Sequence, residues 1–196
     1  FQLVVYKTNT YKSGKIHAKF TYLVTASGTV DLIVNFKKEG TLPDVPRLGI
    51  ALALHPELEN YSWYGEGPWE NYPDRKSSST VGLWKSTVTE QLFPYPRPQE
   101  TGNHEDIRFL NLTNSKKQGI KIQTLENPFS ASALHYSVND LASETHNCHL
   151  VPRKEVILSI DAAVMGLGNS SCGPGVLKKY TLDKKEYDLR IRITAP

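Results

Sequence analysis

Two glutamates, Glu66 and Glu70, lie four positions apart in the segment WYGEGPWENYPDR, which runs from Trp63 to Arg75. Glycoside hydrolysis requires two carboxyl groups about 5 to 9 Å apart, one to protonate the leaving oxygen and one to act as nucleophile or base. The Gly-Pro-Trp sequence between the two glutamates leaves their geometry open. Nearby glutamates in a polar loop more often bind a ligand or hold the loop together, and we favour those roles here.

The aromatic residues of the same segment suit a carbohydrate ligand. Aromatic faces stack on the apolar faces of sugar rings, while carboxylates, Asn and Arg hydrogen-bond to hydroxyl groups. Four Gly or Pro residues predict a stiff loop rather than a helix or a central strand. Rigid loops of this composition often bind ligands. The alternative is that Trp63, Tyr64 and Trp69 anchor the loop on the core.

A second glycine-rich segment, MGLGNSSCGPG, runs from Met165 to Gly175. Its four glycines and one proline surround small polar side chains, so that backbone amides can approach a ligand or a partner closely. The same composition also fits a tight connection between two strands. The sequence leaves both interpretations open.

Composition and charge exclude several function classes. The net charge of +3 comes without a Lys/Arg-rich block, so we expect no nucleic-acid partner. No apolar stretch approaches the ~20 residues that cross a bilayer, and we expect no membrane association. No nucleotide-binding glycine motif or GxSxG motif is present. His146 and Cys148 can supply two metal ligands, but structural zinc needs four, and we predict no metal site.

The chain opens on Phe1 without an initiator Met or a signal peptide, and we expect it to be a fragment or a processed product of a longer protein. Cys148 and Cys172 are too few for a disulfide scaffold and are expected to be free thiols. A cytoplasmic and a periplasmic location both remain open.

Period-two alternation of apolar and polar residues dominates the regular parts of the chain and predicts strands. It predicts a hairpin with arms from Lys15 to Thr25 and from Val30 to Phe36, joined at Ser27-Gly28. Further strands are predicted from Arg47 to Leu54, Ile107 to Leu112, Ile120 to Leu125, Val156 to Ile160 and Tyr187 to Ile193.

The best helical signal lies from Val138 to Thr145, where Ser137 as N-cap and Asp140 form a loose capping box. The many short strands indicate an all-β fold of antiparallel sheets, a sandwich with at most one or two short helices. Two long irregular stretches, Tyr61 to Thr80 and Phe93 to Glu105, have lengths that usually signal a function. We predict a single domain over residues 1–196.

Four blocks of the sequence, in order, resemble one family. The range from Tyr64 to Arg75 is similar to the Gly-x-Gly-Pro-x-Glu-Asn-Tyr-Pro-Asp-Arg signature in the C-terminal "small chain" domain of large bacterial β-galactosidases, glycoside hydrolase family 2. The matching blocks that follow are PQETGNHED from Pro98, FSASALHYS from Phe129 with Thr145-His146, and Ile160-Asp161 leading into Met165-Gly-Leu-Gly. The resemblance spans essentially the whole chain.

The resemblance implies a β-supersandwich fold like that of the galactose mutarotases, in the last domain of a multidomain retaining glycosidase that hydrolyses terminal β-D-galactosyl residues. It places the catalytic glutamates in an upstream (β/α)-barrel domain, which would be this domain's partner. No catalytic residue and no cofactor are expected here, and the isolated chain is expected to be inactive. Divalent or sodium ions can bind in the barrel domain, and the whole enzyme can form a homo-oligomer.

The resemblance also implies which residues lie near the β-galactoside substrate. The loop after Met-Gly-Leu-Gly contributes to the sugar site in the family, which points to Asn169, Ser170 and Cys172. Family members often carry a Trp where this chain has Cys172. A thiol offers a far smaller apolar face than an indole. Either the aglycone subsite is therefore weaker and differently selective, or another aromatic such as Trp69 provides the stacking surface.

Glu70 and Asn71 complete the predicted substrate-binding set. Asp74 and Arg75 are expected to form an ion pair that fixes the loop or docks it on the barrel.

Two other functions remain as alternatives. An independent carbohydrate-binding module would use Trp63, Trp69 and Tyr72 as its stacking platform. A sugar epimerase of the mutarotase type would need a general acid and a general base, for which His104, His135 and Glu70 are the candidates.

Overall fold

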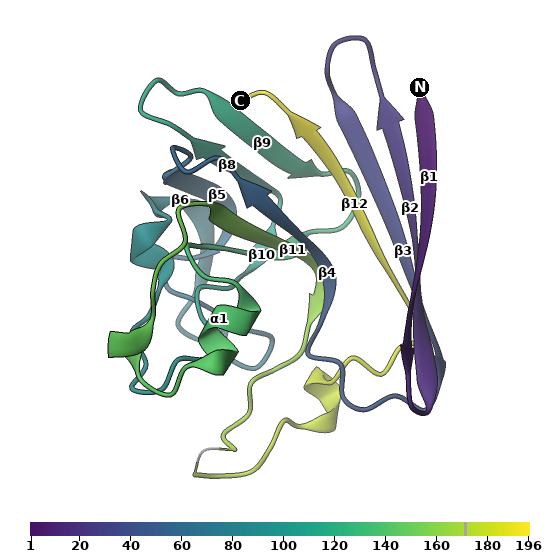
Figure 1. Cartoon of the computed structure of the whole chain (residues 1–196), viewed down its shortest axis with the longest axis vertical. Coiled ribbons are helices and arrows are strands. Elements are labelled where there is room, and N and C mark those ends of the chain that lie inside the picture. The colour runs from purple at the N-terminus through teal and green to yellow at the C-terminus, as the bar shows by residue number, and fades with distance from the viewer. Residues whose placement is uncertain (171) are drawn as a thin grey trace.

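Two antiparallel sheets form the fold of the computed structural model, which describes residues 1–170 and 172–196 (Figure 1). The larger sheet has the strand order β1-β2-β3-β12-β9-β8-β5-β6, and the smaller has the order β4-β11-β10-β7. The strands are β1 (Gln2–Tyr11), β2 (Gly14–Val24), β3 (Val30–Gly40), β4 (Arg47–Leu54), β5 (Asn60–Gly67), β6 (Thr80–Thr87), β7 (His104–Ile107), β8 (Phe109–Thr113), β9 (Gly119–Thr124), β10 (Phe129–Leu134), β11 (Val156–Val164) and β12 (Glu186–Thr194). The predicted all-β, sandwich-like fold is confirmed.

The strands with clear period-two alternation form as predicted. The hairpin of β2 and β3 pairs in register from Gly14–Gly40 to Val24–Val30, and β12 lies between β3 and β9. Leu189 and Ile191 of β12 are buried because alternate side chains of a strand point to the same face. The buried residues of both sheets form one core, and each large side chain buried there contributes about 1.5–3 kcal/mol.

The strand predicted from Ile107 to Leu112 is two strands in two different sheets. β7 pairs with β10 in the smaller sheet, whereas β8 pairs with β5 and β9 in the larger one. Asp106 has a φ of 54°, and the Arg108 amide bonds to the carbonyl of Tyr64 where the chain passes between the sheets. The apolar pattern predicted the strands but not the crossing.

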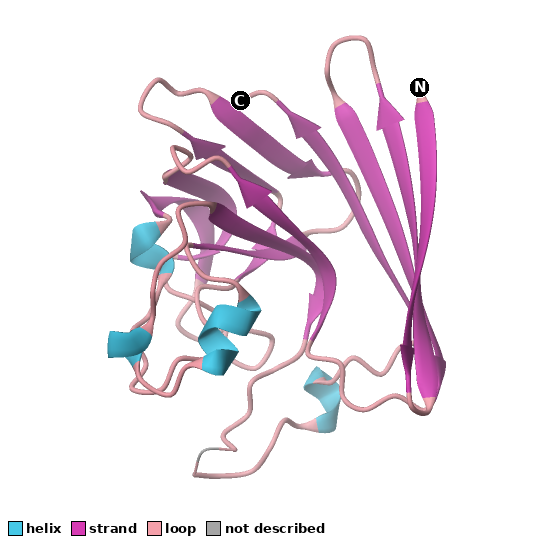
Figure 2. Ribbon diagram, in the orientation of Figure 1, coloured by secondary structure: helices cyan, strands magenta, loops and turns pink. Residues whose placement is uncertain are grey.

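α1 (Val138–Ser143), the one α-helix among the described residues, starts as predicted and ends two residues earlier. Ser137 accepts a hydrogen bond from the Asp140 amide, and the Asp140 carboxylate accepts one from the Ser137 amide, which completes the capping box. Short 3₁₀ turns occur at η1 (Thr89–Gln91), η2 (Asn147–His149) and η3 (Lys178–Tyr180). Figure 2 shows these helical segments outside the sheets, among the long loops.

The first five residues of the Trp63–Arg75 segment are not a loop, which corrects the prediction. They form the end of β5, which pairs with β6 on one side and with β8 on the other. Glycine suits this strand because a Cβ atom on Gly67 would lie 2.6 Å from the Trp84 ring, and one on Gly65 would lie 2.9 Å from the Ile107 backbone. The irregular path begins only at Pro68.

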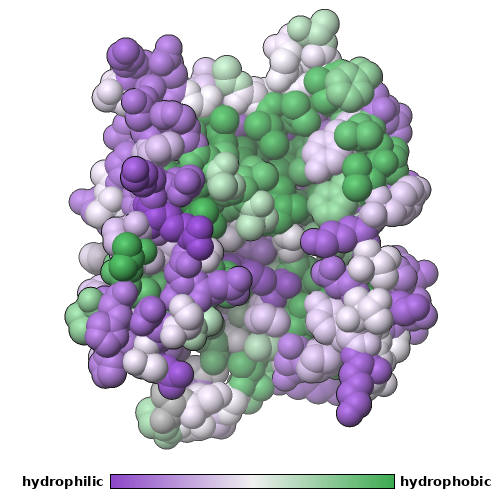
Figure 3. Space-filling model, viewed as in Figure 1, coloured by the Kyte–Doolittle hydropathy of each residue, from purple (hydrophilic) through white to green (hydrophobic). Residues whose placement is uncertain are grey.

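Polar and apolar surfaces separate on the face seen in Figure 3. Hydrophobic side chains gather in its upper half, and hydrophilic side chains dominate its lower half. Among the residues that the structure describes, no helix combines the length and apolar character needed to cross a membrane.

Candidate functional site

Trp63 anchors the inner side of the Trp63–Arg75 segment in the core. It is only 1% exposed, and its ring lies 4.8 Å from Tyr61 and 4.1 Å from His104 between centroids. The indole nitrogen donates to the Glu66 carbonyl at 2.9 Å. Tyr72 is also fully buried. Core anchoring therefore holds for Trp63 but not for Tyr64 and Trp69, which are 38% and 72% exposed.

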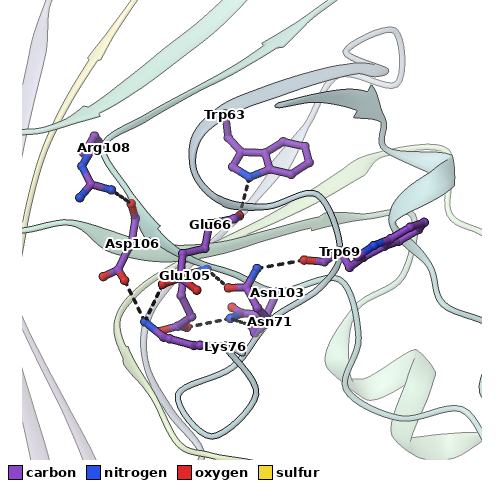
Figure 4. Close-up of polar contacts among 9 residues, drawn as sticks. All are labelled: Trp63, Glu66, Trp69, Asn71, Lys76, Asn103, Glu105, Asp106 and Arg108. Atoms are coloured by element: carbon purple, nitrogen blue, oxygen red, sulfur yellow. Dashed lines mark hydrogen bonds and ion pairs between the residues drawn. The ribbon is translucent and has the colours of Figure 1, made fainter. Parts of the chain in front are cut away.

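Asn71 lies inside the protein and joins the segment to the residues before β7 (Figure 4). Its Nδ2 donates to the Trp69 carbonyl at 2.9 Å, and its Oδ1 accepts from the Glu105 amide at 2.7 Å. Asn103 Nδ2 donates to the Asn71 carbonyl and to Glu105 Oε1, both at 2.8 Å. The Asn71 side chain bonds within the protein, so this geometry gives it a structural role rather than the predicted ligand contact.

A charged cluster lies beside Asn71 (Figure 4). Lys76 Nζ lies 2.9 Å from Asp106, 3.6 Å from Glu66 and 3.8 Å from Glu105. Burial raises the pKa of Glu66 and of Glu105. Burial opposes ionisation of Asp106, but the hydrogen bond and charge of Lys76, the Glu66 hydrogen bond and the Arg108 charge together outweigh burial and lower the pKa of Asp106. The cluster holds the end of β5 and the chain around Lys76 against β7.

Glu70 belongs to a different network from Glu66. Its carboxylate accepts hydrogen bonds from the Tyr95 hydroxyl, from Thr101 Oγ1 at 2.9 Å and from the Gly102 amide at 2.7 Å. Burial, followed by the hydrogen bond to Glu70, raises the pKa of Tyr95 to about 12. The two glutamates therefore do not act as a pair, and Glu70 fastens the long loop that begins at Phe93.

Trp69 points away from these networks, as Figure 4 shows. Its side chain is 72% exposed and lines a pocket of about 460 Å³. Leu92, Phe93 and Tyr95 form part of the same lining. The sequence marked the Phe93 to Glu105 stretch by its length, but it did not single out Phe93 or Tyr95. Two aromatics two positions apart in a proline-rich stretch were the available signal.

Asp74 and Arg75 connect the two glycine-containing motifs of the sequence. The Asp74 carboxylate accepts hydrogen bonds from the Leu167 amide at 3.0 Å and the Gly168 amide at 2.8 Å. Arg75 Nη2 donates to the Gly168 carbonyl at 3.2 Å. The predicted ion pair between Asp74 and Arg75 is wrong, because each side chain binds the backbone of the Leu167–Gly168 peptide instead. We call this arrangement the Asp74 clamp.

Glycine is required where the Asp74 clamp holds the chain. A Cβ atom on Gly166 would lie 2.7 Å from the Asp74 carboxylate carbon, and Gly168 has a φ of 62°. Beyond the clamp, the Asn169 carbonyl accepts hydrogen bonds from the amides of Cys172 and Gly173. Ser171 lies outside the described residues. The predicted substrate-binding residues Asn169, Ser170 and Cys172 are all exposed on this turn, and Cys148 and Cys172 are free thiols.

Two further sequence blocks meet at Arg47 on β4. Its Nη2 atom lies 3.2 Å from Asp161 of β11 and 3.4 Å from Glu100. Burial raises the pKa of Asp161 to about 7, and Arg47 opposes that shift. Blocks that are distant in the sequence therefore share one buried ionic contact.

The comparisons with known proteins agree with these blocks. The family model described as "Beta galactosidase small chain" matches residues 2–193. The chain is 31% identical to a β-galactosidase of Staphylococcus xylosus over 88% of its length, and 37% identical to one of Kluyveromyces lactis over 74%. It is also 37% identical to "Beta-galactosidase BgaC" of Bifidobacterium adolescentis over 75%. The chain spans only 14% to 17% of the length of these relatives.

Proposed function

The chain belongs to the β-galactosidase small chain family, and from this premise we propose that it works as one domain of an enzyme that hydrolyses terminal β-D-galactosyl residues. In this proposal the domain contacts the sugar at the mouth of the active site. The acid/base and nucleophile glutamates lie in an upstream barrel domain of the same polypeptide. The β-galactoside and that barrel are thus its partners.

The Asp74 clamp is the observation that carries the proposal. Charge-assisted hydrogen bonds from two consecutive amides to one carboxylate are among the stronger polar contacts in proteins. They fix the base of the turn that bears Asn169, Ser170 and Cys172, so the turn can present its polar groups to a sugar with little loss of conformational entropy on binding.

The positions of Glu66 and Glu70 support a catalytic centre elsewhere. Glu66 contacts Lys76, whereas Glu70 is occupied by Tyr95, Thr101 and Gly102. A retaining glycosidase needs its two carboxyl groups on either side of one glycosidic bond. Two glutamates engaged in separate structural networks do not suit that role.

The test uses the complete enzyme that contains this chain and substitutes the clamp residue. Asp74→Ala releases the two amides, and we expect the KM for a galactoside to rise about three- to tenfold with a smaller change in kcat, because the turn binds substrate without performing chemistry. Asp74→Asn keeps one acceptor oxygen and should recover part of the affinity. Asp44→Ala, at an exposed position, is the matched control.

Two results would contradict the proposal. One is an unchanged KM in Asp74→Ala, provided that the variant enzyme is shown to be folded. The other is hydrolysis of a nitrophenyl β-galactoside by this chain without the rest of the enzyme.

The alternative functions lose support from the geometry. Trp63 and Tyr72 are buried, so two of the three aromatics proposed for a stacking platform are closed to a ligand. The epimerase candidates have separate structural partners. His104 lies 2.7 Å from Gln91 and His135 lies 2.9 Å from Glu59, while burial lowers the pKa of His104 to about 3.

A further inference from the structure

We propose that the pocket beside Trp69 is a second carbohydrate site, which binds a neutral hexopyranose on this chain alone. The choice of a β-galactoside as the first ligand to test rests on the proposed function. The pocket is separate from the clamped turn, because its lining contains no described residue from Met165 to Gly175. We call it the Trp69 pocket.

The wall of the Trp69 pocket is made of aromatic side chains that the fold leaves uncovered. Trp69 is 72% exposed and Phe93 is 56% exposed. The Phe93 and Tyr95 rings lie 4.6 Å apart between centroids, at an interplanar angle of 51°. Clustered exposed aromatics on a soluble domain mark binding surfaces. Flat indole and phenyl faces match the apolar face of a pyranose ring.

The aromatic wall is held in place before any ligand arrives. The Trp69 carbonyl accepts a hydrogen bond from buried Asn71, which fixes the backbone that carries the indole. The Tyr95 hydroxyl donates to Glu70, which also binds the Gly102 amide. A ligand therefore orders few side chains when it binds, and each side chain that needs no ordering saves about 0.5–1.5 kcal/mol.

Polar groups from β6 and η1 also line the pocket. Glu90 uses one carboxylate oxygen, Oε2, to accept from Ser86 Oγ at 2.8 Å and from the Thr87 amide at 3.1 Å. Its other oxygen can therefore accept a sugar hydroxyl. Lys85 supplies an ammonium donor on the same lining, whereas the Gln91 amide is already bonded to His104 and to the Thr87 carbonyl. An aromatic wall together with mixed donors and acceptors is suited to a polyhydroxylated ring rather than to a purely apolar ligand.

The size of the Trp69 pocket is also appropriate. Its volume of about 460 Å³ falls in the range of about 300–1,000 Å³ typical of small-molecule sites. A monosaccharide or a disaccharide fits in that space, with the ring stacked on Trp69.

The experiment titrates this chain with methyl β-D-galactopyranoside and follows the three tryptophan indole N–H signals by NMR. We expect the Trp69 signal to shift and saturate at millimolar sugar. Trp84 should respond less, because it does not line the pocket and its indole nitrogen donates to the Gly65 carbonyl. In Trp69→Ala and Phe93→Ala, calorimetry should show affinity lower by at least about tenfold, or about 1.4 kcal/mol.

Tyr6→Ala is the matched control. Tyr6 is 74% exposed on edge strand β1 and is not part of this pocket, so its substitution should leave the affinity within about twofold. The proposal is overturned if the folded wild-type chain shows no saturable shift of Trp69 up to about 50 mM sugar. It is also overturned if Trp69→Ala and wild type bind equally. Since the readout is binding by this chain, it is independent of the KM of the complete enzyme, and either proposal can fail without the other.

Discussion

Trp63 and Trp69 are six positions apart in one segment, yet Trp63 is 1% exposed and Trp69 is 72% exposed. Trp63 is on β5, between two neighbouring strands, where its indole packs on Tyr61 and His104. Trp69 follows the end of that strand and projects outward beside the pocket. The buried part of the segment, around Trp63, therefore stabilises the domain, while the exposed part, around Trp69, is available to bind a ligand.

The largest expected effect comes from truncating the two tryptophans in turn. Trp63→Ala removes a fully buried indole from the core and should lower the free energy of unfolding by about 3–5 kcal/mol. Trp69→Ala removes an exposed side chain and should change it by less than about 0.5 kcal/mol. Urea unfolding of the two variants measures both values. If both variants lose the same free energy of unfolding, the two tryptophans do not differ in their contribution to stability.

The next largest effect concerns Asn71, the buried residue that joins the Trp69 backbone to β7. Asn71→Ala leaves the buried Glu105 amide without its acceptor and the Trp69 carbonyl without its donor, so we expect a loss of roughly 2–3 kcal/mol in the free energy of unfolding. Asn9→Ala, at an exposed position on β1, is the matched control and should be nearly neutral. If Asn71→Ala leaves the free energy of unfolding unchanged, this network does not hold the pocket wall.

The smallest effect is a pH dependence set by His104, whose ring packs on Trp63 and whose Nε2 contacts Gln91 in the pocket lining. Burial lowers the pKa of His104 from 6.5 to about 3. As the pH falls, His104 therefore takes up its proton in the unfolded chain before it does so in the folded chain. The stability that neutral His104 contributes is present above pH 6.5 and is lost as the pH falls towards 3. Between pH 6.5 and 5.5, the range tested, this loss is about 1 kcal/mol.

His104→Gln tests that sign. Compared with wild type, the variant should lose less stability between pH 6.5 and 5.5 in urea unfolding, whatever its stability at pH 7. If the free energy of unfolding has the same pH dependence in both proteins, His104 is not held neutral by burial in the folded chain.

Local patterns in the sequence determined much of the fold. The alternation in β2, β3 and β12 predicted these strands, because one buried face imposes a period of two. Ser137 and Asp140 predicted the start of α1, since the capping contacts join neighbouring residues. The ordered motif blocks likewise indicated the family, which the comparisons confirmed.

Only the tertiary structure decided how these elements meet. Glycines that predicted a loop at Gly65 and Gly67 instead serve close packing on β5, because Ile107 and Trp84 come from other strands. Asp74 binds amides more than 90 positions along the chain, and Arg47 joins Glu100 to Asp161. The sequence alone thus determined the strands with clear alternation, the helix start and the family. The pairing of the sheets determined which Trp is buried, because burial and long-range hydrogen bonds depend on neighbours that no local pattern specifies.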